Sequence, residues 1–306
     1  MPADAARLQP ARVFEVGPRD GLQNERVLVP VEHKLELVER LVAAGLHDIE
    51  IGSFVHPKWV PQMADTEQLA RRIPRRPGVR YWALVPNYKG YERAVRAGID
   101  HIGVVLSASE THNRNNLNRS REQSLEQIAR VARSAVDRGH TWRGYISTAF
   151  GCPFEGAIAP EQVIEIADRL RALDAAEISF GDTIGVATPR QVAALCRRLI
   201  ERFGARRIAM HLHDTRGLGL VNAYAALECG VRIIDSSVAG LGGCPYAPGA
   251  AGNIGTEDLV NLLTGSGFDA GIEIERVVDT SRWLRDRVGV TPSSKYFRYA
   301  SARCSA

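Results

Sequence analysis

The feature that most constrains the fold of this 306-residue chain is a regular alternation of short β-type runs with longer helical patterns. Strands are predicted at 12–16, 48–51, 80–85, 101–106, 142–148, 176–180, 207–213 and 233–238. A segment with the apolar spacing of a helix follows each run. Strand-then-helix units with short connections predict an α/β fold, a (β/α)8 TIM barrel. A doubly wound open sheet is the main alternative, but no GxGxxG motif follows the first strand.

The boundaries of the elements define one expected domain, residues 11–290. A last helix at 273–288 would pack outside the barrel as a short C-terminal helical extension. Residues 62–72 are predicted as a single helix, and residues 109–118 as a polar loop that precedes a long helix. The segments 1–10 and 291–306 are expected to be flexible termini.

Composition excludes several classes of protein. The net charge of +4 comes almost wholly from arginines scattered along the helices, which argues against nucleic-acid binding but favours an anionic substrate. The five cysteines show no CxxC spacing and no disulfide framework, as expected in a reducing compartment. No apolar run approaches the ~20 residues of a membrane span, and residues 1–10 lack a signal-peptide core. We therefore expect a cytoplasmic protein without a membrane segment.

His211 and His213 stand at the end of the seventh predicted strand, one residue apart. Strand side chains alternate, so both imidazoles project from one face and could share a metal ion. Taken alone, the pair could equally be hydrogen-bonded structural histidines. In a barrel, however, the carboxyl ends of all the strands meet at one mouth. Polar residues follow the other strands as well, namely Arg19, Asp20, Gln23, Glu50 and Asp182.

Buried charges are costly unless they are paired or coordinated, so this convergence favours a metal site. Asp20 is the natural carboxylate ligand, and Asn253, in the loop after the eighth strand, is the expected amide ligand. Imidazoles with a carboxylate and an amide oxygen favour a divalent ion over a structural zinc. Each of these two residues could instead be an ordinary turn residue.

Residues 240–249 form the glycine-rich sequence GLGGCPYAPG. Glycines at this density allow a flap that can close over a substrate. Cys244 lies within the flap and could act there as an acid–base group. The alternative is a plain glycine-rich turn that carries an inert thiol.

Five motifs now identify a resemblance. GPRDGLQNE at 17–25, SFV at 53–55 through WVPQM at 59–63, GDTIG at 181–185, HLHDT at 211–215 and GLGGCPY at 240–246 follow one another in order. Together they resemble the 3-hydroxy-3-methylglutaryl-CoA (HMG-CoA) lyases, which belong to the metal-dependent TIM-barrel lyases and Claisen-type synthases. The resemblance extends from about residue 13 to residue 263.

The resemblance implies retro-Claisen cleavage of an acyl-CoA thioester, HMG-CoA, to acetyl-CoA and acetoacetate, and suggests a homodimer. Mg²⁺ or Mn²⁺ would be held by Asp20, His211, His213 and Asn253. Arg19 would stabilise the enolate, and Cys244 would be the acid on the flap. Glu50 and Gln23 would support the site, Asp182 would be a further carboxylate near the acyl chain, and the base would be Asp20 or His211.

One segment departs from the family pattern. Residues 109–118 differ from the apolar, lysine-rich version of the mitochondrial enzymes and resemble a bacterial variant. Because this segment is expected at the substrate mouth, the acyl group could be that of citramalyl-CoA or a longer-chain hydroxyglutaryl-CoA. With four lysines in the chain, arginines are the alternative contacts for the CoA phosphates. A Claisen-condensing acyltransferase is less favoured, because GCPY stands where related synthases carry another motif.

Overall fold

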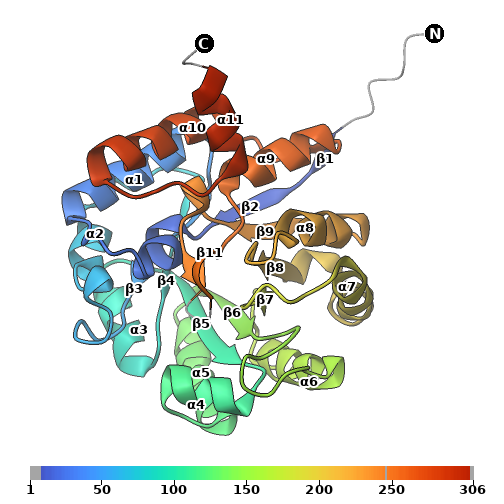
Figure 1. Ribbon diagram of the computed structural model, residues 1–306. Coiled ribbons are helices and arrows are strands. Elements are labelled where there is room, and N and C mark those ends of the chain that lie inside the picture. The colour runs from blue at the N-terminus through green and yellow to red at the C-terminus, as the bar shows by residue number, and fades with distance from the viewer. Residues whose placement is uncertain (1–7, 245–246, 304–306) are drawn as a thin grey trace.

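The computed structural model describes residues 8–244 and 247–303, and its centre is a closed barrel of parallel strands surrounded by helices (Figure 1). The prediction of a (β/α)8 TIM barrel is confirmed. Its strands, in barrel order, are β2 (Arg12–Glu15), β3 (Asp48–Ser53), β4 (Arg80–Leu84), β5 (His101–Ser107), β6 (Thr141–Ser147), β7 (Glu177–Asp182), β8 (Ile208–Leu212) and β9 (Ile233–Ser236).

Helices cover the outside of the barrel. They are α1 (Val31–Ala43), α2 (Thr66–Arg72), α3 (Tyr88–Arg96), α5 (Arg121–Asp137), α6 (Pro160–Arg171), α7 (Pro189–Phe203), α8 (Gly219–Glu228) and α9 (Thr256–Gly265). Local sequence sets several of the starts. Ser120 and Thr188 form capping boxes with the glutamines three residues later, and Pro189 occupies the first turn of α7.

Two predicted segments differ from the structure. Residues 62–72 are divided into a 3₁₀ turn, Pro61–Met63, and α2. The predicted polar loop 109–118 contains a further helix, α4 (Glu110–Leu117). Its asparagines have low helix propensity, but Ser109 caps the first turn by accepting from the His112 N–H, and Asn118 ends the helix in the left-handed conformation.

The C-terminal segment also differs from the prediction. The extension is present as α10 (Ile274–Trp283) with a π-helical turn, Leu284–Val288, and lies beside α1 and α9 (Figure 1). Part of the segment expected to be flexible forms α11 (Lys295–Arg303), with Phe297 buried. Asp258 of α9 accepts from the N–H groups of Lys295 and Tyr296 and so fixes the start of α11.

The N-terminal segment is held as well, because β1 (Gln9–Pro10) pairs with β12 (Phe268–Asp269). Of the predicted flexible termini, residues 1–7 and 304–306 lie outside the described residues. Among the described helices, none has the length and apolar character needed to cross a membrane.

Alternation along the strands separates two environments. On β8, Met210 and Leu212 pack into the apolar layer between the strands and the helices. Residues of the opposite parity face the barrel interior, where Phe14 packs against Trp82. The interior also holds charges, because Arg143 is fully buried with Asp235 and Glu177 as its ion-pair partners. The barrel is therefore filled by paired charges and aromatic rings.

Two buried carboxylates hold the turn that leads from β9 to the glycine-rich segment. Glu15 accepts from the Val238 N–H at 2.9 Å, and Glu257 accepts from the Ala239 N–H at 3.1 Å. Both side chains are fully buried. Burial raises the pKa of Glu15 to about 7 and that of Glu257 to about 8, against the opposing effect of their hydrogen bonds.

The raised pKa of Glu257 predicts a pH-dependent stability. In the pH range between its ordinary pKa and about 8, the folded protein binds a proton that the unfolded chain releases, so stability falls as the pH rises. Glu257→Gln should remove this contribution, and its free energy of unfolding relative to wild type should rise by about 4 kcal/mol between pH 5 and pH 9. Denaturant unfolding at several pH values measures the difference. Glu275→Gln, at an exposed position of α10, is the control, and a pH-independent difference for Glu257→Gln would contradict the prediction.

Candidate metal centre and active site

The site begins at the sharp turn that follows β2. The N–H groups of Arg19, Asp20 and Gly21 all donate to the carbonyl oxygen of Val16, at 3.1, 2.7 and 3.1 Å, and form one π-helical turn. Such single turns occur frequently at functional sites. The turn brings two sequence neighbours to the same cavity, where the Arg19 guanidinium pairs with the Asp20 carboxylate at 2.5 Å.

Arg19 is held in place by a second carboxylate. Its Nε donates to Oε2 of the fully buried Glu50 on β3, and the Tyr145 hydroxyl on β6 donates to the other Glu50 oxygen at 3.0 Å. Burial alone would lower the pKa of Arg19, but the charges of Glu50 and Asp20 outweigh it and raise the pKa. The guanidinium is therefore fixed in position and permanently charged.

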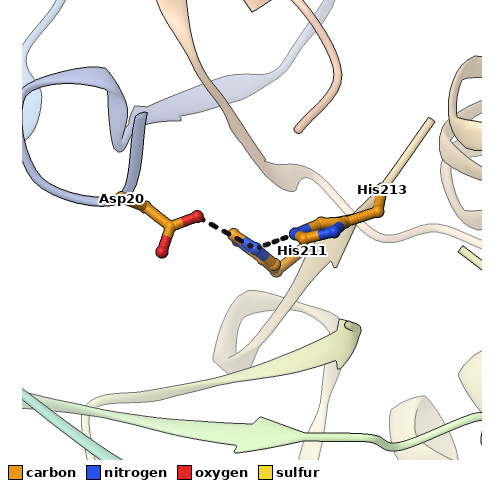
Figure 2. A group of neighbouring side chains, drawn as sticks. All are labelled: Asp20, His211 and His213. Carbon is orange, nitrogen blue, oxygen red and sulfur yellow. Dashed lines mark hydrogen bonds and ion pairs between the residues drawn. The ribbon is translucent and has the colours of Figure 1, made fainter. Parts of the chain in front are cut away.

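Asp20, His211 and His213 form one group at the barrel mouth, on two different elements (Figure 2). The Nε2 atoms of the two histidines face each other at 3.1 Å, and His211 Nε2 lies 3.9 Å from an Asp20 oxygen. One ligand atom from each residue lies within 4.8 Å of the others. Two nitrogens bound about 2.1 Å from one ion at right angles would be roughly 3 Å apart. The residues therefore fit a divalent cation.

The protonation states fit a metal as well. Burial would raise the pKa of Asp20, but the charge of Arg19, and next that of His211, lowers it well below its ordinary value. Burial and then the charge of His211 lower the pKa of His213 to about 3. At neutral pH the group therefore presents an ionised carboxylate beside a neutral His213 imidazole, as a cation requires.

Asn253 reaches the same point from the segment after the glycine-rich loop. Its backbone forms a bridge with His213, and its side-chain amide nitrogen lies 2.9 Å from an Asp20 oxygen. The same nitrogen donates to the Leu241 carbonyl oxygen at 3.2 Å, so the Asn253 side chain ties the start of the glycine-rich segment to Asp20. Gly242, at φ +104°, permits this approach, since a Cβ there would lie 2.5 Å from the Asn253 amide nitrogen.

Asp235 is a site residue that the sequence analysis missed. It is buried on β9, and its Oδ2 lies 3.3 Å from Nδ1 of His211. The Ser179 hydroxyl donates to the same oxygen at 2.9 Å, and Arg143 pairs with the other. A carboxylate behind a metal-ligating histidine orients the ring and selects the tautomer with a free Nε2. Strand parity could have identified Asp235, which lies two residues after the inward-facing Ile233.

Asp182 does not reach the cavity. Its two carboxylate oxygens accept from the N–H groups of Val186 and Ala187, at 2.9 and 3.0 Å, in the loop between β7 and α7. It has the same parity on β7 as Ile178 and Phe180, which pack against the helices. This position differs from the predicted carboxylate near the acyl chain and gives Asp182 a role in shaping the loop. Gln23, by contrast, lines the cavity, and its predicted supporting role stays a prediction.

The glycine-rich segment forms an antiparallel hairpin of β10 (Gly243–Cys244) and β11 (Ala247–Ala251). Figure 1 shows β11 over the barrel mouth. Gly243 lines the cavity, so the backbone of Cys244 is at its rim. The Cys244 side chain, with residues 245–246, lies outside the described residues, and its predicted acid role stays a prediction.

A cavity of about 660 Å³ extends from this group of residues. Its lining includes Gln23, Asn24 and Trp59, together with the C-terminal part of α4 and Arg119. The departing segment 109–118 therefore contributes to the cavity wall, as the sequence indicated. The fold and the site define the class of protein: a (β/α)8 barrel with a candidate divalent-metal centre at the carboxyl ends of its strands.

Comparison with known proteins gives the family. Residues 11–284 match the family model described as HMGL-like. The chain is 46% identical over 288 residues to the hydroxymethylglutaryl-CoA lyase of Pseudomonas mevalonii. This alignment covers 94% of this chain and 96% of the relative. The HMG-CoA lyase structure from Bacillus subtilis superposes with a TM-score of 0.94 at 43% identity, covering 96% of this chain and 98% of that one. The chain belongs to the HMGL-like family.

A further relative was solved with ligands. The structure of an HMG-CoA lyase from Acinetobacter baumannii, in complex with coenzyme A and 3-methylmalate, superposes with a TM-score of 0.90 at 38% identity. The superposition covers 94% of each chain. The likeness therefore extends over the whole barrel, including the segments that carry the cavity.

The contact between Asp235 and His211 generates a prediction. Asp235→Asn keeps the shape of the side chain but removes the charge that selects the His211 tautomer, so Mn²⁺ affinity should fall roughly 10–100-fold. Titration followed by electron paramagnetic resonance measures it. Glu177→Gln is the matched control, because Glu177 also pairs with Arg143 but is no partner of His211. Equal Mn²⁺ affinity in Asp235→Asn and wild type would contradict the role of Asp235 in orienting His211.

Proposed function

We propose that this protein is a divalent-metal-dependent HMG-CoA lyase, which cleaves HMG-CoA to acetyl-CoA and acetoacetate. The observation that carries the proposal is the convergence of Arg19, Asp20, His211 and His213 on one cavity in a member of the HMGL-like family. The names of relatives 44–46% identical over most of the chain support the same reaction.

The metal would be held by Asp20, His211, His213 and Asn253, with Mg²⁺ or Mn²⁺ as the proposed ion. When bound, it supplies a positive charge that lowers the pKa of the substrate's 3-hydroxyl group. The chain's own contribution is to fix the ligands. Asp235 orients His211, and Arg19 keeps the Asp20 carboxylate ionised through its charge.

Arg19 performs the electrostatic part of the reaction. Asp20 or His211 is the proposed base that takes the hydroxyl proton. Cleavage of the bond between C2 and C3 then releases acetoacetate and leaves negative charge on the thioester oxygen of acetyl-CoA. The Arg19 guanidinium is fixed by Glu50 before the charge develops. A preorganised cation of this kind stabilises the enolate without further reorganisation.

The enolate carbon must then receive a proton, and Cys244 is the proposed acid. Its backbone lies in the hairpin beside Gly243, a residue of the cavity wall. The hairpin, whose strand β11 lies over the barrel mouth (Figure 1), is also proposed to limit access of water, which would strengthen the electrostatic interactions inside. Gln23 and Glu50 are proposed to support the substrate pocket and Arg19, respectively.

The acyl group could be that of a related substrate. Exposed asparagines of α4 line the cavity, together with the buried His112, whose Nδ1 lies 2.6 Å from the Ser107 hydroxyl. This polar wall suits a short acyl chain that carries a carboxylate, such as citramalyl-CoA, as well as HMG-CoA. The dicarboxylate bound to the A. baumannii relative gives this second candidate its support.

A cytoplasmic location and a homodimer are also proposed. The location is supported by the free thiols of Cys152, Cys196 and Cys229, which suit a reducing compartment. The homodimer rests on the family resemblance, and light scattering after gel filtration would test it.

The activity test separates the candidates. Wild-type protein with Mg²⁺ should release acetyl-CoA and acetoacetate from HMG-CoA, whereas EDTA should suppress the release and added Mg²⁺ or Mn²⁺ should restore it. Arg19→Ala is the control for the chemistry and should lower turnover at least a hundredfold. Cleavage of citramalyl-CoA without cleavage of HMG-CoA would assign the activity to that substrate instead. Release of free CoA from acetyl-CoA and 2-oxo acids would indicate a condensing enzyme.

The acid role of Cys244 has its own test. Cys244→Ser should lower kcat a hundredfold or more, the usual effect of losing a general acid, while KM changes little. Cys229→Ser, a half-buried thiol on the outer helices, is the control and should keep normal turnover. A kcat for Cys244→Ser within threefold of wild type would rule out the proposed role.

A further inference from the structure

The charges on the cavity wall are not balanced. Among the described residues that line the cavity, the permanently charged cations are Arg19 and Arg119, and the carboxylate is Asp20. Arg19 is neutralised by Asp20 and by Glu50 behind it. Arg119 comes from the segment between α4 and α5 and pairs with no carboxylate of the described chain. This part of the cavity therefore carries a net positive charge.

Neighbouring arginines show that this arrangement is specific to Arg119. Arg114 and Arg121, on either side of it, both pair with Glu110. Neither of these two arginines lines the cavity, although both lie within five residues of Arg119 in the sequence. Arg119 is thus the arginine of this segment that combines a position on the cavity wall with an uncompensated charge.

Arg119 is also held in position by buried contacts. The side chain of Asn113, which is fully buried, accepts from the Ser107 N–H and donates to the Arg119 carbonyl at 2.9 Å. One N–H of the guanidinium donates to the Pro86 carbonyl at 3.1 Å. A guanidinium has five N–H donors, so most of them are available to a ligand. The backbone and one end of the side chain are fixed before any ligand binds.

Amide groups stand beside it on the same wall. Asn87 caps α3 through its side-chain oxygen, which accepts from the Gly90 N–H at 2.9 Å, so its amide nitrogen is left as a donor. Asn116 and Asn118 line the cavity as well. Arginine with amide donors is the chemistry that binds carboxylate and phosphate oxygens.

We propose that Arg119, with Asn87 and Asn116, forms an anion subsite that binds a carboxylate or phosphate group of the acyl-CoA. This inference rests on the proposed function for the identity of the ligand. The two anionic groups of such a ligand, the acyl carboxylate and the phosphates of CoA, share the same chemistry. Arg119 would act by binding and positioning, and has no part in breaking the carbon–carbon bond.

The test compares Arg119→Gln with wild type. For HMG-CoA we expect KM to rise roughly tenfold and kcat to change less than twofold, the result of losing a charge-assisted contact made equally in substrate and transition state. Arg119→Lys, which keeps the charge but not the fork of donors, should restore part of the affinity. Arg114→Gln, on the exposed side of α4, is the matched control and should keep wild-type kinetics.

Two binding measurements by calorimetry identify the anion. CoA carries the phosphates without the acyl carboxylate, and free 3-hydroxy-3-methylglutarate carries carboxylates without phosphates. A weaker Kd for CoA in Arg119→Gln supports the phosphate, and a weaker Kd for the free acid supports the carboxylate. If both Kd values and the KM stay within twofold of Arg114→Gln, the subsite is refuted. Wild type that binds CoA but does not cleave HMG-CoA would contradict the proposed function alone, because the binding measurements need no turnover.

Discussion

The candidate metal ligands and Arg19 both depend on the ion pair between Arg143 and Asp235 in the centre of the barrel. Asp235 lies against His211 on one side, at 3.3 Å. Arg143 lies 3.4 Å from the hydroxyl of Tyr145, which in turn donates to Glu50, the partner of Arg19. The candidate metal ligands and Arg19 are therefore positioned by one continuous network of buried groups. Removing one member of a buried pair would leave an uncompensated charge, which costs about 3–5 kcal/mol.

The fold could be predicted from sequence because a barrel repeats one pattern. Each strand has an apolar outer face, represented on β8 by Met210 and Leu212, and the helices follow with their own spacing. The predictions of secondary structure were wrong where tertiary contacts outweigh local propensity. Helix α4 is rich in asparagine, and its stability depends on the Ser109 cap and on the buried Asn113. Helix α11 is fixed by Asp258, a residue more than thirty positions earlier.

The site could be predicted only in part, for a related reason. Side chains that directly follow the strands, such as Asp20 and His213, were identified by position and residue type. The roles of Asp182 and Asp235 were not, because each depends on the face of the strand to which its side chain points. Asp182 shares the outward parity of Phe180, while Asp235 points inward to His211. Which guanidinium lacks a carboxylate partner is likewise invisible in sequence, since pairing is decided by neighbours distant in the chain.

The bridge between His213 and Asn253 links the hairpin to the barrel mechanically. The Gly252 N–H donates to the Gly242 carbonyl inside the hairpin, and the Gly252 carbonyl accepts from the Asp214 N–H beside the candidate ligands. Any displacement of the hairpin base is thus transmitted within one residue to Asn253 and, through its amide, to Asp20. Access to the barrel mouth and the arrangement of the candidate ligands therefore both depend on the position of the hairpin. A substrate that moves the hairpin would also change the position of Asn253 relative to Asp20 and His213.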